Sequence, residues 1–159
     1  MTFHSDLFSP IIGREKVSLY WYESKDGCEY ARSLFHRHYS YKKYADGRDP
    51  KRFVGPGERI VLIREQGLFV WRKFISGDNQ EGVGCSIFRN ESKEIRSSDL
   101  ILDAEEIAIK KWGSTRLYTY VNAAKTTSQN PGYCFKCAGW KTCGITKINK
   151  LVILEKTIS

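Results

Sequence analysis

Three apolar runs decide the fold: Arg59-Ile-Val-Leu-Ile-Arg64, Leu68-Phe-Val-Trp-Arg-Lys-Phe74 and Val83-Gly-Cys-Ser-Ile-Phe-Arg89. β-Branched and aromatic residues dominate these short runs, a composition typical of strands in a buried sheet. The turn-forming Glu65-Gln-Gly67 joins the first run to the second, and the longer polar segment Ser76–Gly82 joins the second to the third. Connections this short place consecutive strands side by side, so we predict three antiparallel strands in succession.

The residues before these runs predict a strand, a helix and a loop. Val17–Tyr22 is apolar and aromatic, and we interpret it as a buried strand. Between Tyr30 and His38 apolar residues recur at intervals of three and four, which predicts one face of a helix. Tyr39–Glu58 loses this periodicity and is predicted to be a basic, aromatic loop.

A longer helix is predicted after the third run. Ser97, Ser98 and Asp99 offer side chains that can cap exposed backbone N–H groups, and Gly113 can end the helix in a left-handed turn. The remaining predicted elements are a strand at Arg116–Val121, a short helix that Asn130-Pro131 begins and Gly139 ends, and strands at Lys141–Lys147 and Leu151–Lys156.

This order of elements predicts a mixed α/β sheet. Antiparallel neighbours followed by crossovers through helices place helices on both faces of one sheet. The chain has 159 residues and no internal repeat or long linker, so we expect a single domain over residues 1–159. No apolar run approaches the roughly 20 residues of a membrane span. Residues 1–12 lack the pattern of a secretory signal, and we therefore expect a cytoplasmic protein.

The charge of the chain points to a polyanionic partner. Lys and Arg number 26 against 18 Asp and Glu, a formal net charge of +8, which favours nucleic acid. From Arg32 to Arg59, eight basic and three acidic residues give a net +5, with aromatic residues between them. A solvated loop without a partner is the alternative interpretation. The residues predicted to contact double-stranded DNA are Lys42, Lys43, Arg48, Lys51, Arg52, Lys125 and Lys141.

The five cysteines are expected to be thiols, because their number is odd and the expected compartment is reducing. Cys134, Cys137 and Cys143 lack the second close pair that a zinc site needs, so no metal site is assigned. Iron bound through His36 or His38 and carboxylates stays open.

The order of elements resembles the GNAT (Gcn5-related N-acetyltransferase) fold along nearly the whole chain. In that fold a central pair of strands separates, and the opening holds the arm of an acyl-CoA. Two features of GNAT enzymes are missing here. The stretch Phe88–Ser98, where the glycine-rich turn for the CoA pyrophosphate would lie, contains no glycine. Four residues before Gly139-Trp140, where a tyrosine would protonate the leaving thiolate, the chain has Phe135, and Tyr133 points to another side of the predicted helix.

Three motifs resemble the Mom-type DNA-modification proteins of bacteriophages: His38-Tyr-Ser40, Leu117-Tyr-Thr-Tyr-Val-Asn122 and Asn130-Pro-Gly-Tyr-Cys-Phe-Lys-Cys-Ala-Gly-Trp140. This resemblance implies a GNAT-like enzyme that converts adenine in DNA to N6-carbamoylmethyladenine and so protects the DNA from host restriction enzymes. If the chain is phage-encoded, the resemblance also implies that it acts in the cytoplasm of the host cell.

The candidate catalytic residues gather around these motifs. His38 can act as a base, although a buried histidine satisfied by a backbone group is the alternative interpretation. Tyr118, Tyr120 and Asn122 share one face of a predicted strand, where they could stack on and hydrogen-bond a flipped base. The candidate catalytic set is His38, Tyr39, Ser40, Arg89, Asn90, Tyr120 and Asn122, and the candidate cofactor-binding set is Arg89, Ser97, Ser98, Asn130 and Tyr133.

Two other functions fit the sequence. A generic GNAT-like acyltransferase would use acyl-CoA on a small amine or a modified base. A non-catalytic DNA-binding protein of the same fold would leave the nucleosides of DNA unchanged. The sequence does not determine the donor of the transferred group, the target sequence or the oligomeric state, for which a homodimer is one option.

Overall fold

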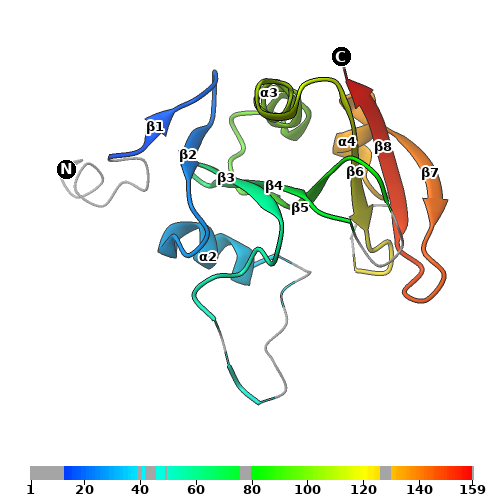
Figure 1. The fold of residues 1–159 in the computed structure, drawn as a ribbon, viewed down its shortest axis with the longest axis horizontal. Helices are drawn as coiled ribbons and strands as arrows, with labels where there is room; N and C mark the ends of the chain where they lie inside the picture. The colour runs from blue at the N-terminus through cyan, green and yellow to red at the C-terminus, as the bar shows by residue number, and fades with distance from the viewer. Residues whose placement is uncertain are drawn as a thin grey trace.

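A computed structural model describes residues 13–38, 41, 46–48, 50–75, 80–125 and 130–158 of the chain. Its elements are β1 (Glu15–Lys16), β2 (Tyr22–Ser24), α2 (Glu29–His36), β3 (Glu58–Arg64), β4 (Gly67–Lys73), β5 (Val83–Asn90), α3 (Ser97–Trp112), β6 (Thr115–Val121), α4 (Tyr133–Cys137), β7 (Lys141–Ile145) and β8 (Val152–Ile158). The strands form one eight-stranded sheet in the order β1-β2-β3-β4-β5-β6-β8-β7 (Figure 1). Within this sheet β5 and β6 are parallel, and the other neighbouring strands are antiparallel.

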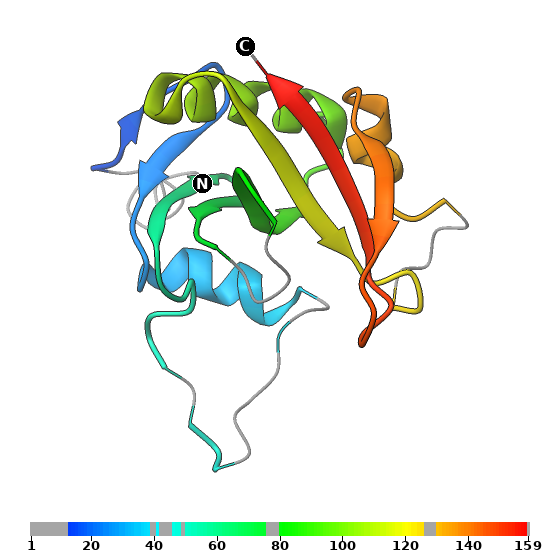
Figure 2. The same cartoon turned by 45° about the vertical axis from the view of Figure 1, so that its right-hand side comes forward.

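The predicted mixed sheet with helices on both faces is confirmed. Helix α2 lies against one face, and α3 and α4 lie on the other (Figures 1 and 2). The three apolar runs form β3, β4 and β5, each within one residue of the predicted bounds. In β3, Leu62 packs on the α3 side and Ile63 on the α2 side. Because both faces are covered, these strands are apolar at successive positions and do not alternate with polar ones.

Three buried tryptophans attach the sheet to α3. The indole N–H of Trp21 donates to the carbonyl oxygen of Leu100 at 2.9 Å, and that of Trp71 donates to the carbonyl of Ala104 at 2.9 Å. The indole N–H of Trp140 donates to the Glu105 carboxylate at 2.8 Å. A buried indole needs such a partner, and these partners lie on one face of α3.

The prediction of a strand at Val17–Tyr22 is wrong except at Tyr22, where β2 begins. The backbone N–H of Tyr20 and the hydroxyl of Ser18 instead donate to the carboxylate of Asp103 on α3, at 2.7 and 2.6 Å. In a strand, the Tyr20 N–H would bond to a neighbouring strand. Because it bonds to Asp103 of α3, the segment bends over that helix. Trp21 is nevertheless fully buried, as the apolar pattern predicts.

The helix starts lie near their predicted positions, but the predicted capping side chains are wrong. The N-cap of α3 is Arg96, and no side-chain cap hydrogen bond is present there. Helix α4 begins after Gly132, and the Asn130 side chain accepts a hydrogen bond from Lys136. Helix α2 ends at His36, so His38 lies just beyond it.

None of the helices in the described part of the chain is long and apolar enough to cross a membrane.

Candidate active site

The candidate site begins where β5 and β6 separate. The two strands pair only over Val83–Cys85 and Leu117–Thr119, although β5 continues to Asn90. The hydroxyl of Thr119 donates to the carbonyl oxygen of Cys85 at 2.9 Å, at the last pair of the parallel ladder. Beyond this point the carboxyl ends of two parallel strands diverge, which is a common position for ligand sites in mixed sheets.

A β-bulge coincides with the point of separation. Val70 of β4 pairs with Ile87, and the next residue, Trp71, pairs with Cys85, so Ser86 is an extra residue in β5. A bulge bends the strand that carries it and increases its twist. We infer that this bend turns β5 away from β6 and opens the sheet.

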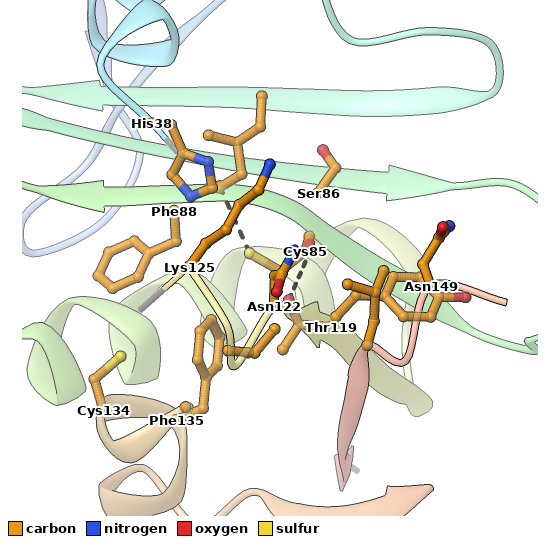
Figure 3. A pocket seen from close by; sticks show the side chains of 15 residues that line it. His38, Cys85, Ser86, Phe88, Thr119, Asn122, Lys125, Cys134, Phe135 and Asn149 are labelled. Atoms are coloured by element: carbon orange, nitrogen blue, oxygen red, sulfur yellow. Dashed lines mark hydrogen bonds between the residues drawn. The ribbon is translucent and has the colours of Figure 1, made fainter. Parts of the chain in front are cut away.

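A cavity of about 510 Å³ occupies the opening (Figure 3). Side chains enter it from β5, from β6 and the residues after it, from α4, from the residues after α2 and from the β7–β8 hairpin. A mostly apolar wall with a few polar groups is typical of a small-molecule or base-binding site. The polar side chains that line the cavity are His38, Ser86, Thr119, Tyr120, Asn122, Lys125 and Asn149.

Two phenylalanines form an aromatic wall of this cavity. Phe88 of β5 and Phe135 of α4 meet edge to face, with ring centroids 5.9 Å apart. Phe135 is 6% exposed, whereas Tyr133 on the same helix is 60% exposed and does not line the cavity. The prediction that these two residues point to different sides of the helix is therefore confirmed. Helix α4 offers the cavity a stacking surface and no phenolic proton donor.

His38 lies at the junction of α2 and the cavity. Its backbone N–H donates to the carbonyl of Phe35 at 2.8 Å, which extends the end of the helix by a turn. Burial and the positive charge of Arg89 lower the pKa of His38 to about 4, against the opposite effect of a hydrogen bond with the Phe88 backbone. The imidazole is therefore neutral at pH 7, and a neutral imidazole has one ring nitrogen that can accept a proton. Burial and the backbone partner agree with the alternative interpretation of a buried, satisfied histidine, and a pKa of about 4 makes the imidazole a weaker base than a free histidine.

The low pKa of His38 predicts a loss of stability in mild acid. Because its folded pKa, about 4, lies below the ordinary value of 6.5, the unfolded chain binds the proton first as the pH falls. We expect the free energy of unfolding to decrease by up to about 3 kcal/mol between pH 6.5 and 4 from this group. Denaturant unfolding of the wild type and of His38→Gln over this range measures the difference. An equal loss in both proteins would contradict the assignment.

Two cysteine thiols also line the cavity. Burial is the main reason why the pKa values of the Cys85 and Cys134 thiols are raised. A thiol attacks as its thiolate, so both groups are poor nucleophiles at neutral pH. The raised thiol pKa values therefore argue against either cysteine as the nucleophile.

Arg89 does not line the cavity and belongs to an ion-pair cluster with Glu91 and Arg37. The Glu91 carboxylate accepts from Arg37 Nε at 2.7 Å and from Arg89 Nε at 2.5 Å. These hydrogen bonds, that of Arg37 foremost, lower the pKa of Glu91 to about 2. The cluster joins the end of α2 to the end of β5, so it supports the position of His38 in the wall.

The turn between β5 and α3 is held together by hydrogen bonds within the protein. The side-chain oxygen of Asn90 accepts the backbone N–H of Ser92 at 3.0 Å, and its amide donates to the Ser97 hydroxyl at 3.2 Å. The backbone N–H of Glu91 donates to a carbonyl in the β3–β4 turn, and that of Glu94 donates to the Ser92 hydroxyl. Phosphate cradles use free backbone N–H groups, and the N–H groups of Glu91, Ser92 and Glu94 already have partners inside the protein, which argues against a CoA pyrophosphate at these three residues.

We therefore expect coenzyme A and acetyl-CoA to leave the melting temperature unchanged. A ligand that binds only the folded chain raises this temperature, and the rise keeps growing with the logarithm of the ligand concentration above Kd. Differential scanning fluorimetry with increasing acetyl-CoA makes the test. A concentration-dependent rise would restore the acyltransferase alternative.

The structure brings three of the candidate catalytic residues to the cavity. These are His38, Tyr120 and Asn122, and Tyr118 is buried beside Tyr120 with ring centroids 5.8 Å apart. Tyr39, Ser40, Lys42 and Lys43 lie outside the described residues. The described candidates that do not line the cavity are Arg89, Asn90, Ser97, Ser98, Asn130 and Tyr133.

Sequence reasoning missed several lining residues. Ser86 and Thr119 are polar residues inside apolar strands, and this contrast was a usable signal. Thr119 alternates with Tyr120 along β6, yet both reach the cavity at the place where the strands part. Asn149 belongs to the β7–β8 hairpin, and its sequence context carries no sign of a site.

Exposed basic side chains occur in the loop before β3, in the β7–β8 hairpin and, at Lys125, in the cavity wall. The described residues of the loop before β3 and the β7–β8 hairpin extend from the same end of the molecule in both views (Figures 1 and 2). Arg48 in the loop forms an ion pair with Asp46 at 2.6 Å. The exposed basic residues of these two segments and of the cavity mouth include Arg48, Lys51, Arg52, Lys125, Lys141, Lys147 and Lys150.

The described residues bring no three His, Cys, Asp or Glu side chains together in a group that could hold a metal ion. The described residues therefore offer no further ligands for an iron ion at His36 or His38.

Comparison of the chain with protein-family models and with curated proteins finds no match.

Proposed function

We propose that the protein is a Mom-type DNA-modifying enzyme that acts on the N6 amine of adenine, on a GNAT-like scaffold. The observation that carries the proposal is the cavity between β5 and β6, with a neutral His38 in its wall and aromatic and amide side chains around it. The separated parallel strands support the GNAT-like scaffold, since that fold opens at the corresponding pair.

The lining suits an adenine base. Phe88, Phe135 and Tyr120 offer apolar surfaces against which a base can stack. Asn122 and Asn149 carry side-chain amides, each with a donor and an acceptor, and the edge of adenine presents the same combination. The Asn122 oxygen also accepts the backbone N–H of Ala124 at 3.1 Å, which fixes the orientation of this amide.

The chemistry requires a base inside the cavity. The lone pair on adenine N6 is delocalised into the ring, so the amine attacks a donor only if its proton is removed as the new bond forms. Neutral His38 can accept that proton, and general-base assistance contributes roughly 10²–10⁴-fold when the pKa of the base lies near the working pH, so the low pKa of His38 places its contribution at the lower end. Lys125 at the mouth places a positive charge where a leaving group could develop negative charge.

A base in a duplex is inaccessible to this cavity, so the enzyme has to extrude it. Extrusion costs about a few kcal/mol, which contacts to the DNA backbone must offset. The basic loop before β3 and the basic β7–β8 hairpin can supply those contacts, and the number of their cations predicts binding that weakens steeply with salt.

Mass spectrometry of nucleosides from bacterial cells that express the protein tests the proposal. We expect a second adenine nucleoside, heavier than deoxyadenosine, in DNA from expressing cells and not in DNA from cells with an empty vector. Unmodified adenine together with salt-dependent DNA binding would instead indicate a non-catalytic DNA-binding protein.

A further inference from the structure

We propose that Ile148, at the tip of the β7–β8 hairpin, is a wedge that enters the base stack of duplex DNA while the extruded base occupies the cavity. This inference rests on the proposed function, because it takes duplex DNA as the partner. It adds the residue that fills the gap left by the base.

The hairpin presents Ile148 as a fixed projection. The backbone N–H of Thr146 donates to the carbonyl of Leu151 at 2.9 Å, and the N–H of Leu151 donates to the Thr146 hydroxyl at 2.8 Å. Four residues form the tip, and Lys150 adopts the left-handed conformation with φ 56° that such loops use to rejoin the strand. Ile148 is 90% exposed, so its side chain contributes little to the core.

The tip is adjacent to the cavity. Asn149, the next residue, and Leu151 both line the cavity. Tyr120 lines the cavity and also an apolar hollow of about 780 Å³ beneath the hairpin. An apolar side chain at the tip is therefore one residue away from a group that would contact the extruded base.

The side chains around Ile148 are positively charged, as the phosphates of DNA require. Lys147 and Lys150 are exposed on either side of it, and no acidic residue occurs between Lys141 and Leu151. An apolar tip between cations fits a base step, which is apolar in its stack and flanked by phosphates. Proteins that unstack DNA insert isoleucine, leucine, methionine or phenylalanine in this way.

The test uses a short duplex with 2-aminopurine in place of several adenines, because the fluorescence of this base rises when it leaves the stack. We expect wild-type protein at saturation to raise the fluorescence and Ile148→Ala to reduce that rise about tenfold. Ile145→Ala is the matched control, since Ile145 is 61% exposed on the same hairpin but is paired with Val152 in the sheet. It should behave like the wild type.

The outcomes separate the wedge from the proposed function. A rise with Ile148→Ala equal to that of the wild type would overturn the wedge alone. Wild-type binding without any rise would show that no base leaves the stack, and it would overturn both the wedge and the base extrusion that the proposed function requires. Failure of the wild type to bind the duplex at low salt would overturn both proposals. Loss of the rise in Ile148→Ala, with duplex affinity retained as measured by fluorescence anisotropy, would support the wedge and argue against a protein partner at this tip.

Discussion

His38→Ala is expected to abolish adenine modification while the chain still unfolds cooperatively. His38 lines the cavity and its imidazole is neutral at pH 7, so a ring nitrogen can accept a proton there, although burial makes it a weaker base than a free histidine. Loss of a general base reduces rates by roughly 10²–10⁴-fold, which would bring the modified nucleoside below detection in expressing cells. Nucleoside mass spectrometry measures the product.

His38→Gln is the control that separates basicity from packing. Glutamine keeps a side-chain donor for the Phe88 carbonyl but has no basic nitrogen. We expect it to be as inactive as His38→Ala and to bind duplex DNA like the wild type. Full activity in either variant would show that His38 is not the general base.

Glu105→Ala is expected to cause the largest loss of stability. Glu105 is 4% exposed on α3 and accepts from Lys156 at 2.7 Å and from the indole of Trp140 at 2.8 Å. Its removal leaves a buried indole N–H without its partner and a partly buried ammonium without its carboxylate. We expect a loss of about 3 kcal/mol in the free energy of unfolding and a melting temperature lower by roughly 10 °C.

Glu106→Ala is the matched control for this loss. Glu106 is the next residue of the same helix and is exposed. Its replacement should change the melting temperature little, because exposed positions away from special contacts contribute little to stability. Equal effects of the two substitutions, measured by thermal unfolding, would show that the Glu105 contacts do not stabilise the fold.

Much of the sheet could be predicted from local pattern. The runs that became β3, β4 and β5 are short, apolar and bounded by turn residues, and these properties are visible in a single sequence. The strand prediction for Val17–Tyr22 was wrong because the carboxylate of Asp103, which is distant in sequence, accepts hydrogen bonds from the Tyr20 N–H and the Ser18 hydroxyl. A local pattern carries no information about such a contact.

The candidate site was predictable in part. His38 and Asn122 were chosen for their chemistry and position, and both line the cavity. Asn90 was chosen because it ends a strand beside the expected opening, but its amide closes the β5–α3 turn. The bulge at Ser86 depends on the register of β4 and β5, which the sequence does not state.

The most direct measurement tests whether adenine binds in the cavity. NMR amide shifts of the labelled protein would be compared between a short single-stranded oligonucleotide that carries one adenine and the same oligonucleotide with an abasic residue there. We expect the differences to gather at Phe88, Asn122, Phe135 and Asn149, which line the cavity. Identical shifts with the two oligonucleotides, or differences confined to residues elsewhere, would contradict adenine binding between β5 and β6.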